Sequence, residues 1–326
     1  MSALDKDMEG YDHYNKGIQK RTEGRKVKRK GGKTKYKTKE NIAGYLFLAP
    51  QMLGVLIFSV IPIIFSFYLG FTDWDYISGF DNIEWVGLKN YIDMWKDVAF
   101  VDSLINTLIF TASTVILELG LGVVVAVIID KRVYGSGYFK VAFFIPYISS
   151  LVAVSVVFKA MLQPTYGPVN QFLMSLGIDN PPGWFGDAKW SLAAVILLTV
   201  WRDLGYYVIV FLAALKGVSK ELYEAAALDG ASGLKQFFYI TVPMIRPTTF
   251  FLMVTGVIGS FKAFDQIAVT TQGGPGTSSS VLVYYIYNSA FKFYKMGYAS
   301  AMAWVLFILI FVVTLIQWKH QNVDVE

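Results

Sequence analysis

The chain alternates between long hydrophobic runs and shorter polar connectors. Six runs are long and apolar enough to be membrane-spanning helices, because a helix needs about 20 mostly apolar residues to cross a bilayer. Their approximate ranges are 43–71, 104–129, 138–161, 191–215, 245–268 and 298–318. The pattern therefore predicts an all-α membrane protein with six transmembrane helices. Pro50 and Pro62 predict kinks, not breaks, in the first helix, since neighbouring helices can satisfy the freed carbonyls.

One polar connector, between the fourth and fifth runs, contains the residues of two short helices. Residues 221–228 favour helix, and Gly230 can end it. Ser232 can cap a second helix that runs toward Ile240, and Pro243 can end that helix. Two transmembrane helices can be joined without so ordered a connector. We therefore expect a cytoplasmic helix pair that docks onto a partner in the aqueous phase.

Composition agrees with a bilayer protein and excludes several kinds of chemistry. The chain of 326 residues is 55% hydrophobic and only 16% charged, whereas soluble domains are about 25% charged. It has no cysteine and two histidines, His13 and His320, one near each end. We therefore expect no metal site and no catalytic residue. The chain also lacks a phosphate loop, so it has no ATP-binding site of that kind.

Basic residues concentrate in the N-terminal tail. Residues 1–40 carry 13 Lys and Arg against 6 Asp and Glu, whereas connector 72–103 has two Lys against seven acids. Because Lys and Arg favour the cytoplasmic side, we expect both termini and connector 221–243 in the cytoplasm. Residues 1–40 are expected to be a disordered tail that sets orientation and binds no nucleic acid, since its charges are not part of a structured nucleic-acid-binding motif. Residues 41–320 form the predicted membrane domain.

Ionisable side chains inside apolar runs are costly in lipid and usually functional. Five of them, together with three aromatic residues beside the charged pair of the fourth run, form the predicted substrate path. These residues are Glu118, Trp201, Arg202, Asp203, Tyr206, Tyr207, Lys262 and Asp265. Polar groups beside aromatic faces suit a sugar, and the i, i+4 spacing puts Arg202 with Tyr206, and Asp203 with Tyr207, on common helix faces. The alternative is that these residues join helices to one another or to a partner subunit.

Connector 221–243 resembles the signature loop of permease subunits of binding-protein-dependent ABC importers. That loop reads Glu-Ala-Ala, three residues, Gly, nine residues, Ile, one residue, Leu-Pro, and Val242 stands here where Leu is usual. The matching residues are Glu224, Ala225, Ala226, Gly230, Ile240 and Pro243. Further segments are similar to the carbohydrate branch of these permeases, including those of multiple-sugar and glycerol-phosphate importers. They are residues 46–50, 71–75, 86–91, 103–107, 270–275 and 297–301.

The resemblance implies that the chain is half of an ATP-driven importer of a sugar or oligosaccharide in a bacterial cytoplasmic membrane. It implies a second, homologous permease and an extracytoplasmic solute-binding protein as partners. It also implies two copies of a cytoplasmic ABC ATPase, which bind ATP and magnesium, so that this chain needs no cofactor. The six matching loop residues would couple the ATPase to the spans.

Two other classes stay open on the sequence alone. A proton- or ion-coupled secondary transporter would use Glu118, Asp203 or Asp265 as a relay, and would need no docking connector. Its uptake would collapse with the proton gradient and survive ATP depletion. A membrane-embedded enzyme would need acids or histidines clustered near one interface, and the sequence shows only scattered carboxylates.

Overall fold

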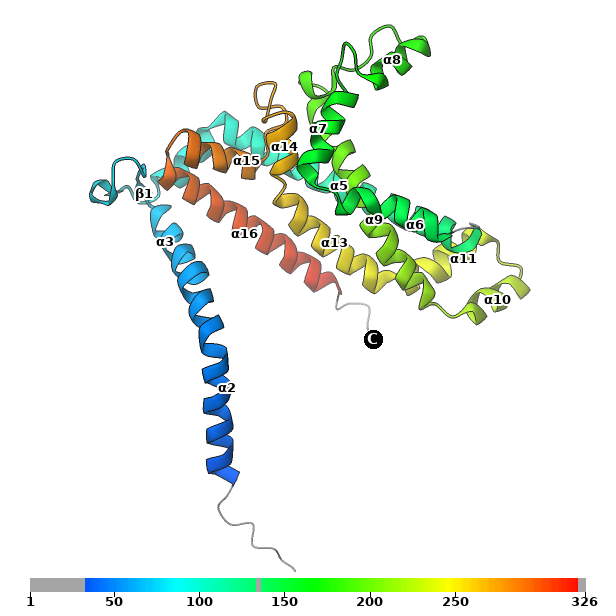
Figure 1. The fold of residues 1–326 in the computed structure, drawn as a ribbon, viewed down its shortest axis with the longest axis horizontal. Helices are drawn as coiled ribbons and strands as arrows, with labels where there is room; N and C mark the ends of the chain where they lie inside the picture. Colours follow the sequence, from blue (N-terminus) through cyan, green and yellow to red (C-terminus); the bar gives the residue numbers. More distant parts are fainter. Residues whose placement is uncertain (1–32, 133–135, 322–326) are drawn as a thin grey trace, which may run out of the picture. The chain divides into compact units, whose positions relative to one another are not determined.

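The computed structural model describes residues 33–132 and 136–321, which are mainly helical (Figure 1). The α-helices are α2 (Lys33–Val55), α3 (Ile61–Leu69), α4 (Lys89–Asp93), α5 (Val98–Arg132), α6 (Ser136–Ile148), α7 (Leu151–Met161), α8 (Pro168–Ser175), α9 (Ser191–Lys216), α10 (Lys220–Leu228), α11 (Gly233–Gln236), α12 (Val242–Met244), α13 (Arg246–Phe261), α14 (Asp265–Thr270), α15 (Leu282–Tyr287) and α16 (Met296–Gln321). Strands β1 (Thr72–Asp73) and β2 (Glu84–Trp85) pair antiparallel, with Thr72 opposite Trp85. The chain divides into two compact units, residues 1–64 and 65–326.

The first unit contains α2 and the π-helical turn η1 (Leu56–Val60), which continues into α3. The helical run passes Pro50 and Pro62 without a break, as predicted. Pro62 follows η1 after one residue; a π turn relieves the clash that a proline ring makes with the carbonyl four residues earlier. Residues 33–40, which we predicted to be disordered, instead begin α2, because lysine-rich sequence without Gly or Pro tolerates helix. The rest of the predicted tail lies outside the described residues.

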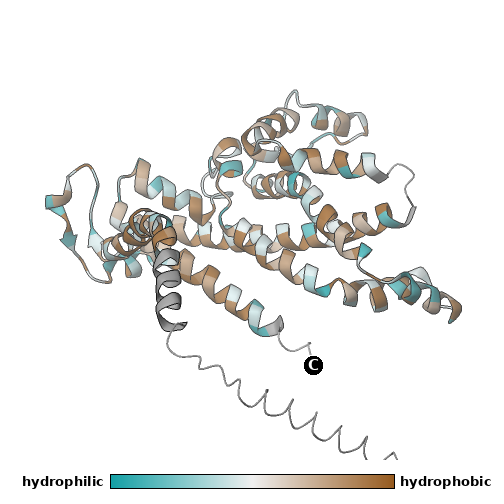
Figure 2. Cartoon of the chain, turned by 60° about the horizontal axis from the view of Figure 1, so that its bottom comes forward, coloured by the Kyte–Doolittle hydropathy of each residue, from teal (hydrophilic) through white to brown (hydrophobic). Residues whose placement is uncertain are grey.

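Four helical segments within the described residues are long and apolar enough to cross a membrane by themselves. They are Gly44–Leu69, Val98–Asp130, Ser191–Lys216 and Met296–Lys319. The count rises to six if each of two bent pairs is a single span: Gly137–Ile148 with Leu151–Met161, and Gly233–Met244 with Arg246–Phe261. Figure 2 shows that hydrophobic residues predominate along the long helices.

The predicted third span, 138–161, is not one continuous helix. α6 and α7 are bent by 98° where they meet. The break lies at Ser150, whose backbone is extended (φ −56°, ψ 126°). Pro146 has no N–H to give to the α6 ladder, and at the end of α6 the carbonyl of Ile145 accepts from both the hydroxyl of Ser149 at 2.8 Å and its N–H at 3.2 Å.

The predicted fifth span, 245–268, is also interrupted. α13 ends at Phe261, and the helical path resumes at Asp265 in α14 after three non-helical residues. At its other end, α13 is bent by 67° from the preceding helical segment. That bend falls at Ile245, two residues before Pro247, whose ring disfavours continuation of the preceding helix.

The second unit is organised around α5, which packs against α9 and α13, while α6 packs along α9. Buried side chains between these helices include Val208, Phe211 and Leu252. Gly205 lets the backbones of α6 and α9 approach closely, because a Cβ atom at this position would lie 1.9 Å from the carbonyl oxygen of Phe143. This contact sets where α6 lies against α9.

One segment that carries the family resemblance, residues 103–107, contacts residues far away in sequence. The amide of Asn106 in α5 donates to the carbonyls of Thr277 at 2.8 Å and Ser280 at 3.0 Å. The hydroxyl of Thr107 accepts from the backbone N–H of Leu282 at 2.8 Å. Segment 103–107 therefore holds the connector that follows α14, which gives these polar residues a structural role.

A partly buried carboxylate, Asp97, links the start of α5 to two other helices. It accepts hydrogen bonds from the hydroxyls of Tyr285 (2.5 Å) and Tyr298 (2.8 Å) and from the backbone N–H of Ala99 (3.0 Å). Burial by itself raises the pKa of Asp97, but these hydrogen bonds outweigh it and hold the pKa below the ordinary value. The ionised form is therefore the one that the folded protein stabilises.

Asp97→Ala is expected to lower the free energy of unfolding by about 1.5 kcal/mol at pH 7, since hydrogen bonds to a charged group are lost. Because the native pKa is depressed, this stabilisation is present above the unfolded-state pKa of about 3.9 and disappears as the pH falls through the native value. Denaturation of the purified wild-type and Asp97→Ala proteins at several pH values measures this difference in the free energy of unfolding. Asp93→Ala is the control, because the Asp93–Lys96 pair is exposed and 3.8 Å long. An Asp97→Ala deficit that stayed constant below pH 3 would contradict the assignment.

Candidate functional site

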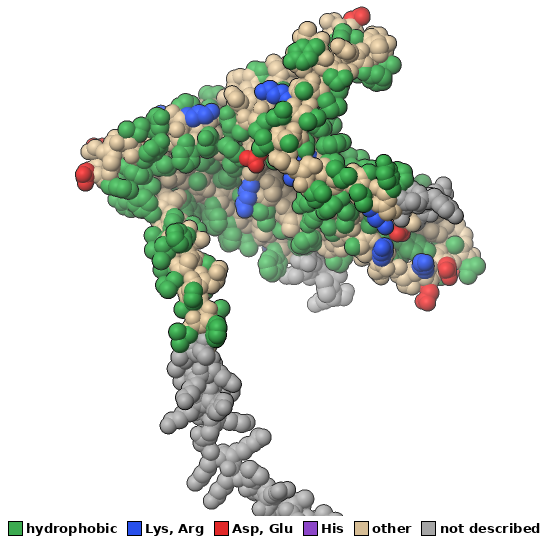
Figure 3. Space-filling model, viewed as in Figure 1, with side chains coloured by type: hydrophobic (Ala, Val, Ile, Leu, Met, Phe, Trp, Pro, Cys, Tyr) green, Lys and Arg blue, Asp and Glu red, His purple; other side chains and the backbone are tan. Residues whose placement is uncertain are grey.

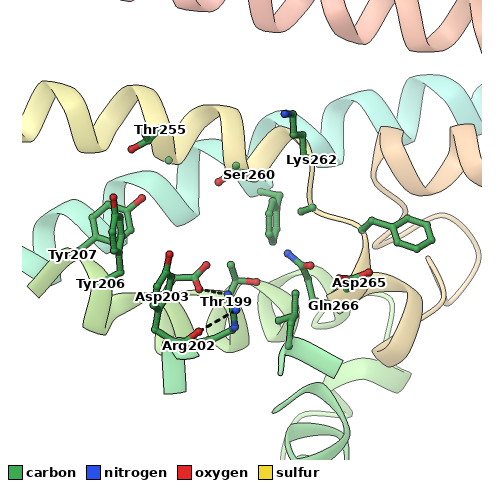
Figure 4. A pocket seen from close by; sticks show the side chains of 17 residues that line it. Thr199, Arg202, Asp203, Tyr206, Tyr207, Thr255, Ser260, Lys262, Asp265 and Gln266 are labelled. Carbon is green, nitrogen blue, oxygen red and sulfur yellow. Dashed lines mark hydrogen bonds and ion pairs between the residues drawn. The ribbon is translucent and has the colours of Figure 1, made fainter. Parts of the chain in front are cut away.

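A cavity of about 550 Å³ lies among α9, α13, α14 and the bend between α6 and α7 (Figure 4). Its polar lining residues are Tyr147, Thr199, Arg202, Asp203, Tyr206, Tyr207, Thr255, Ser260, Lys262, Asp265 and Gln266. The α9 residues recur at spacings of three and four, so that they occupy one face of that helix. Phe110 of α5 and Phe264 add apolar surface.

Arg202 and Asp203 form an ion pair at the cavity, with 2.6 Å between Nη1 and Oδ1. The Nη2 atom of Arg202 also donates to the carbonyl of Tyr147 at 3.2 Å. The Nε atom of Arg202 is buried without a hydrogen-bond partner within the part of the chain that the structure describes. The pair therefore balances its own charge, and the buried Nε is shielded from the cavity by the rest of the guanidinium group.

Aromatic rings stand beside this ion pair. Tyr147 and Tyr206 stack with 5.1 Å between ring centroids, and Tyr206 meets Tyr207 edge to face at 5.8 Å. The guanidinium carbon of Arg202 lies 5.5 Å from the centroid of the Tyr147 ring. The site thus joins flat apolar faces to hydroxyl, carboxylate and guanidinium groups, a combination that can hold the alternating C–H and O–H groups of a sugar.

The structure brings six of the eight predicted path residues to this cavity: Arg202, Asp203, Tyr206, Tyr207, Lys262 and Asp265. Figure 4 shows Lys262 and Asp265 apart from the Arg202–Asp203 pair, and both side chains are exposed.

Two predicted path residues do not line the cavity. Trp201 is 48% exposed and packs on Phe158, with 5.1 Å between ring centroids. Glu118 is only 3% exposed, does not line the cavity, and interacts with Tyr207 of its wall. Trp201 lies two residues from both Thr199 and Asp203, and residues two apart on an α-helix do not share a face.

Sequence reasoning missed the uncharged part of the lining, namely Tyr147, Thr199, Thr255, Ser260 and Gln266. Their hydroxyl and amide groups fall within or beside apolar runs, so searching for all polar residues there, instead of charged ones, would have found most of them. Tyr147 reaches Arg202 through the 98° bend between α6 and α7, which hydropathy alone does not reveal.

A second candidate site is the helical hairpin formed by residues 219–244. Ser219 caps α10 by accepting from the N–H of Glu221 at 3.2 Å, and Ser232 caps α11 through Lys235 at 3.4 Å. Gly230 adopts a left-handed conformation with φ +77°. Around it, the N–H of Ala231 donates to Ala226 at 2.8 Å and that of Gly230 to Ala227 at 3.1 Å. This is the Schellman ending of a helix, so the turn between α10 and α11 is fixed by local hydrogen bonds.

The hairpin has an attached side and a free side. The hydroxyls of Tyr223 and Thr241 lie 2.9 Å apart, and Tyr223 and Ile240 pack against the core below α9. On the free side, large apolar side chains are exposed: Leu228 by 91%, Leu234 by 72% and Tyr239 by 81%. Figure 3 shows charged side chains gathered at the end of the molecule where α10 lies.

The six motif residues divide between these sides. Glu224, Ala225, Gly230 and Pro243 are exposed, whereas Ala226 and Ile240 are partly buried. The prediction that Pro243 ends the second helix is wrong, because α12 continues to Met244. A π-helical turn, η5 (Phe237–Thr241), precedes this proline just as η1 precedes Pro62, and it accommodates the ring in the same way.

Residues 118–320 match the family described as "Binding-protein-dependent transport system inner membrane component". The chain belongs to this permease family. The permease is 35% identical to the arabinooligosaccharides transport system permease protein AraP of Bacillus subtilis over 280 residues. This alignment covers 85% of this chain and 88% of AraP. It is 32% identical over 283 residues to the lactose transport system permease protein LacF of Rhizobium radiobacter, covering 85% and 93% of the two chains.

The permease also shares its fold with a chain in the crystal structure of a bacterial alginate ABC transporter in complex with an alginate pentasaccharide-bound periplasmic protein. The TM-score is 0.75 at 24% identity, and the match covers 88% of this chain and 96% of that chain. These comparisons confirm the predicted resemblance: the permease is an inner-membrane subunit of a carbohydrate-type, binding-protein-dependent ABC importer.

Proposed function

We propose that the permease forms half of the path for a sugar or oligosaccharide through a bacterial cytoplasmic membrane, with six spans and both termini in the cytoplasm. A second, homologous permease completes the path, and an extracytoplasmic binding protein delivers the solute. Two copies of an ABC ATPase, which hold ATP and magnesium, supply the energy. The names of AraP and LacF, and the pentasaccharide-bound protein beside the alginate transporter, support a sugar as the solute.

The cavity supports the same solute class. Arg202 supplies guanidinium N–H groups, Asp203 supplies carboxylate acceptors, and the stacked pair of Tyr147 and Tyr206 supplies a flat apolar face. A neutral polyhydroxylated ligand can use all three at once, without bringing an unbalanced charge into the membrane. The role of this chain is therefore to offer a polar surface along which the sugar passes.

The observation that carries the coupling proposal is the free side of the hairpin. Leu228, Leu234 and Tyr239 are exposed on a turn that its own backbone hydrogen bonds keep ordered. Exposed apolar residues on an ordered element, rimmed by charges, are typical of a protein interface. Tyr223 and Ile240 attach the hairpin to the end of α9, so movement of a partner on the free side would reach the membrane helices.

Cysteine labelling tests both the orientation and the partner, since the chain has no cysteine of its own. Leu228→Cys is expected to react with an impermeant maleimide only from the cytoplasmic side, and to cross-link to the ATPase in the assembled transporter. The matched control is Leu176→Cys after α8, where the side chain is 64% exposed; it should react only from outside and form no cross-link. Labelling of Leu228→Cys from outside, or an active assembly without the cross-link, would overturn the proposal.

A further inference from the structure

Glu118 is buried in α5 behind the cavity wall, and its contacts show what it can do there. It is 3% exposed and does not line the cavity. It shares one face of α5 with Gly122, which meets Tyr207, and its carboxyl group interacts with the hydroxyl of Tyr207, a residue that does line the cavity. Glu118 can therefore affect a passing solute only through another side chain, in contrast to the direct role in the path that we expected.

Tyr207 occupies a slot that two glycines create. A Cβ atom at Gly122 of α5 would lie 2.8 Å from the Cβ of Tyr207. A Cβ atom at Gly256 of α13 would lie 2.4 Å from its hydroxyl oxygen. The ring therefore passes between α5 and α13, with its hydroxyl against the α13 backbone. A tyrosine confined at both ends has few other positions, and a partner for its hydroxyl determines which one it keeps.

The face of α5 that carries Glu118 contacts both neighbouring helices. Thr114, Glu118 and Gly122 follow one another at i, i+4 spacing and so share that face. The hydroxyls of Thr114 and Ser260 lie 3.0 Å apart and join α5 to α13. Ser260 lines the same cavity as Tyr207. The interaction between Glu118 and Tyr207 thus lies at the junction of three helices that shape one wall.

We propose that Glu118 is a positioning residue that fixes the hydroxyl of Tyr207 at the cavity wall and thereby sets how well the sugar is guided through this half of the transporter. This inference rests on the proposed function of the cavity. Glu118 acts as a hydrogen-bond partner, not as a site that gains and loses a proton during transport. Glutamine, which keeps both the shape and the hydrogen-bonding atoms, should therefore replace it.

The test uses the complete transporter, with binding protein and ATPase, in proteoliposomes, and measures sugar transported per ATP hydrolysed. Tyr207→Phe and Glu118→Leu are each expected to lower this ratio about tenfold, the loss that one hydrogen bond of about 1.4 kcal/mol accounts for. Glu118→Gln should stay close to the wild type. The double variant Glu118→Leu/Tyr207→Phe should be no worse than Tyr207→Phe alone, because both changes remove the same interaction.

Several outcomes would overturn the inference. They are a Glu118→Gln variant as impaired as Glu118→Leu, a Glu118→Leu variant with full coupling, and additive losses in the double variant. A purely structural role would lower the yield and unfolding temperature of the assembly with an unchanged sugar-to-ATP ratio. If Glu118→Leu does not assemble, Glu118→Gln and its combination with Tyr207→Phe decide the question. Normal transport by Tyr207→Phe would also overturn the inference and leave the cavity proposal standing, whereas normal transport by Arg202→Ala, at the centre of the cavity, would overturn the cavity proposal itself.

Discussion

Gly230→Asp is expected to abolish sugar uptake while the permease still inserts into the membrane and the ATPase still hydrolyses ATP. Gly230 has φ +77°, where a side chain costs about 1 kcal/mol. The Schellman turn that joins α10 to α11 needs this conformation. Among the described residues, and apart from its two chain neighbours, no heavy atom lies within 4 Å of the site where the new Cβ would be. The substitution therefore changes the turn and its surface charge and leaves the membrane core untouched.

Gly233→Asp is the matched control for this prediction. Gly233 begins α11 in the same hairpin, also has open space around it, and has no positive φ. An aspartate at the first position of a helix is favourable, so the backbone should accept it. Reconstituted transporters would be compared for uptake and for ATPase activity. Normal uptake by Gly230→Asp would contradict the coupling role, and equal loss in both variants would attribute the effect to charge instead of the turn.

The sequence predicted the hairpin in detail because its signals are local. Gly230 and Ser232 act within a few residues of themselves, and both have the roles expected of them. Pro243 was misjudged because a proline stops a helix only when the preceding turn cannot widen. The π-helical turn at Phe237–Thr241 provides that widening. Orientation of the hairpin in the membrane and contact with an ATPase stay predictions.

The cavity was only partly predictable, for a different reason. A charged residue within an apolar run is visible in the sequence, so Arg202 and Asp203 were found. The cavity also depends on Tyr147, which the 98° bend between α6 and α7 brings to Arg202. Hydropathy measures how apolar a segment is and contains no information on where packing bends it. The same limit explains why the third and fifth spans were predicted to be continuous helices.

The contact between α6 and α9 therefore positions Tyr147 beside Arg202 in the cavity. The substitution Gly205→Ala should disrupt this contact. The added Cβ would lie 1.9 Å from the carbonyl oxygen of Phe143 and 3.0 Å from the Cα of Phe144. Both are backbone atoms, so no side chain can turn aside and α6 must move as a whole. Overpacking of this kind costs about 3 kcal/mol. We expect a low yield of assembled permease, a reduced unfolding temperature and little sugar uptake.

Gly120→Ala on α5 provides the comparison, since nothing lies within 4 Å of its added Cβ and alanine favours helix over glycine. It should assemble and transport as the wild type does. Fluorescence-detected size-exclusion chromatography would measure assembly, and uptake in proteoliposomes would measure function. Wild-type assembly and uptake by Gly205→Ala would show that α6 and α9 do not meet as described. Wild-type assembly without uptake would instead locate the damage at the cavity, because moving α6 displaces the Tyr147 carbonyl that accepts from Arg202.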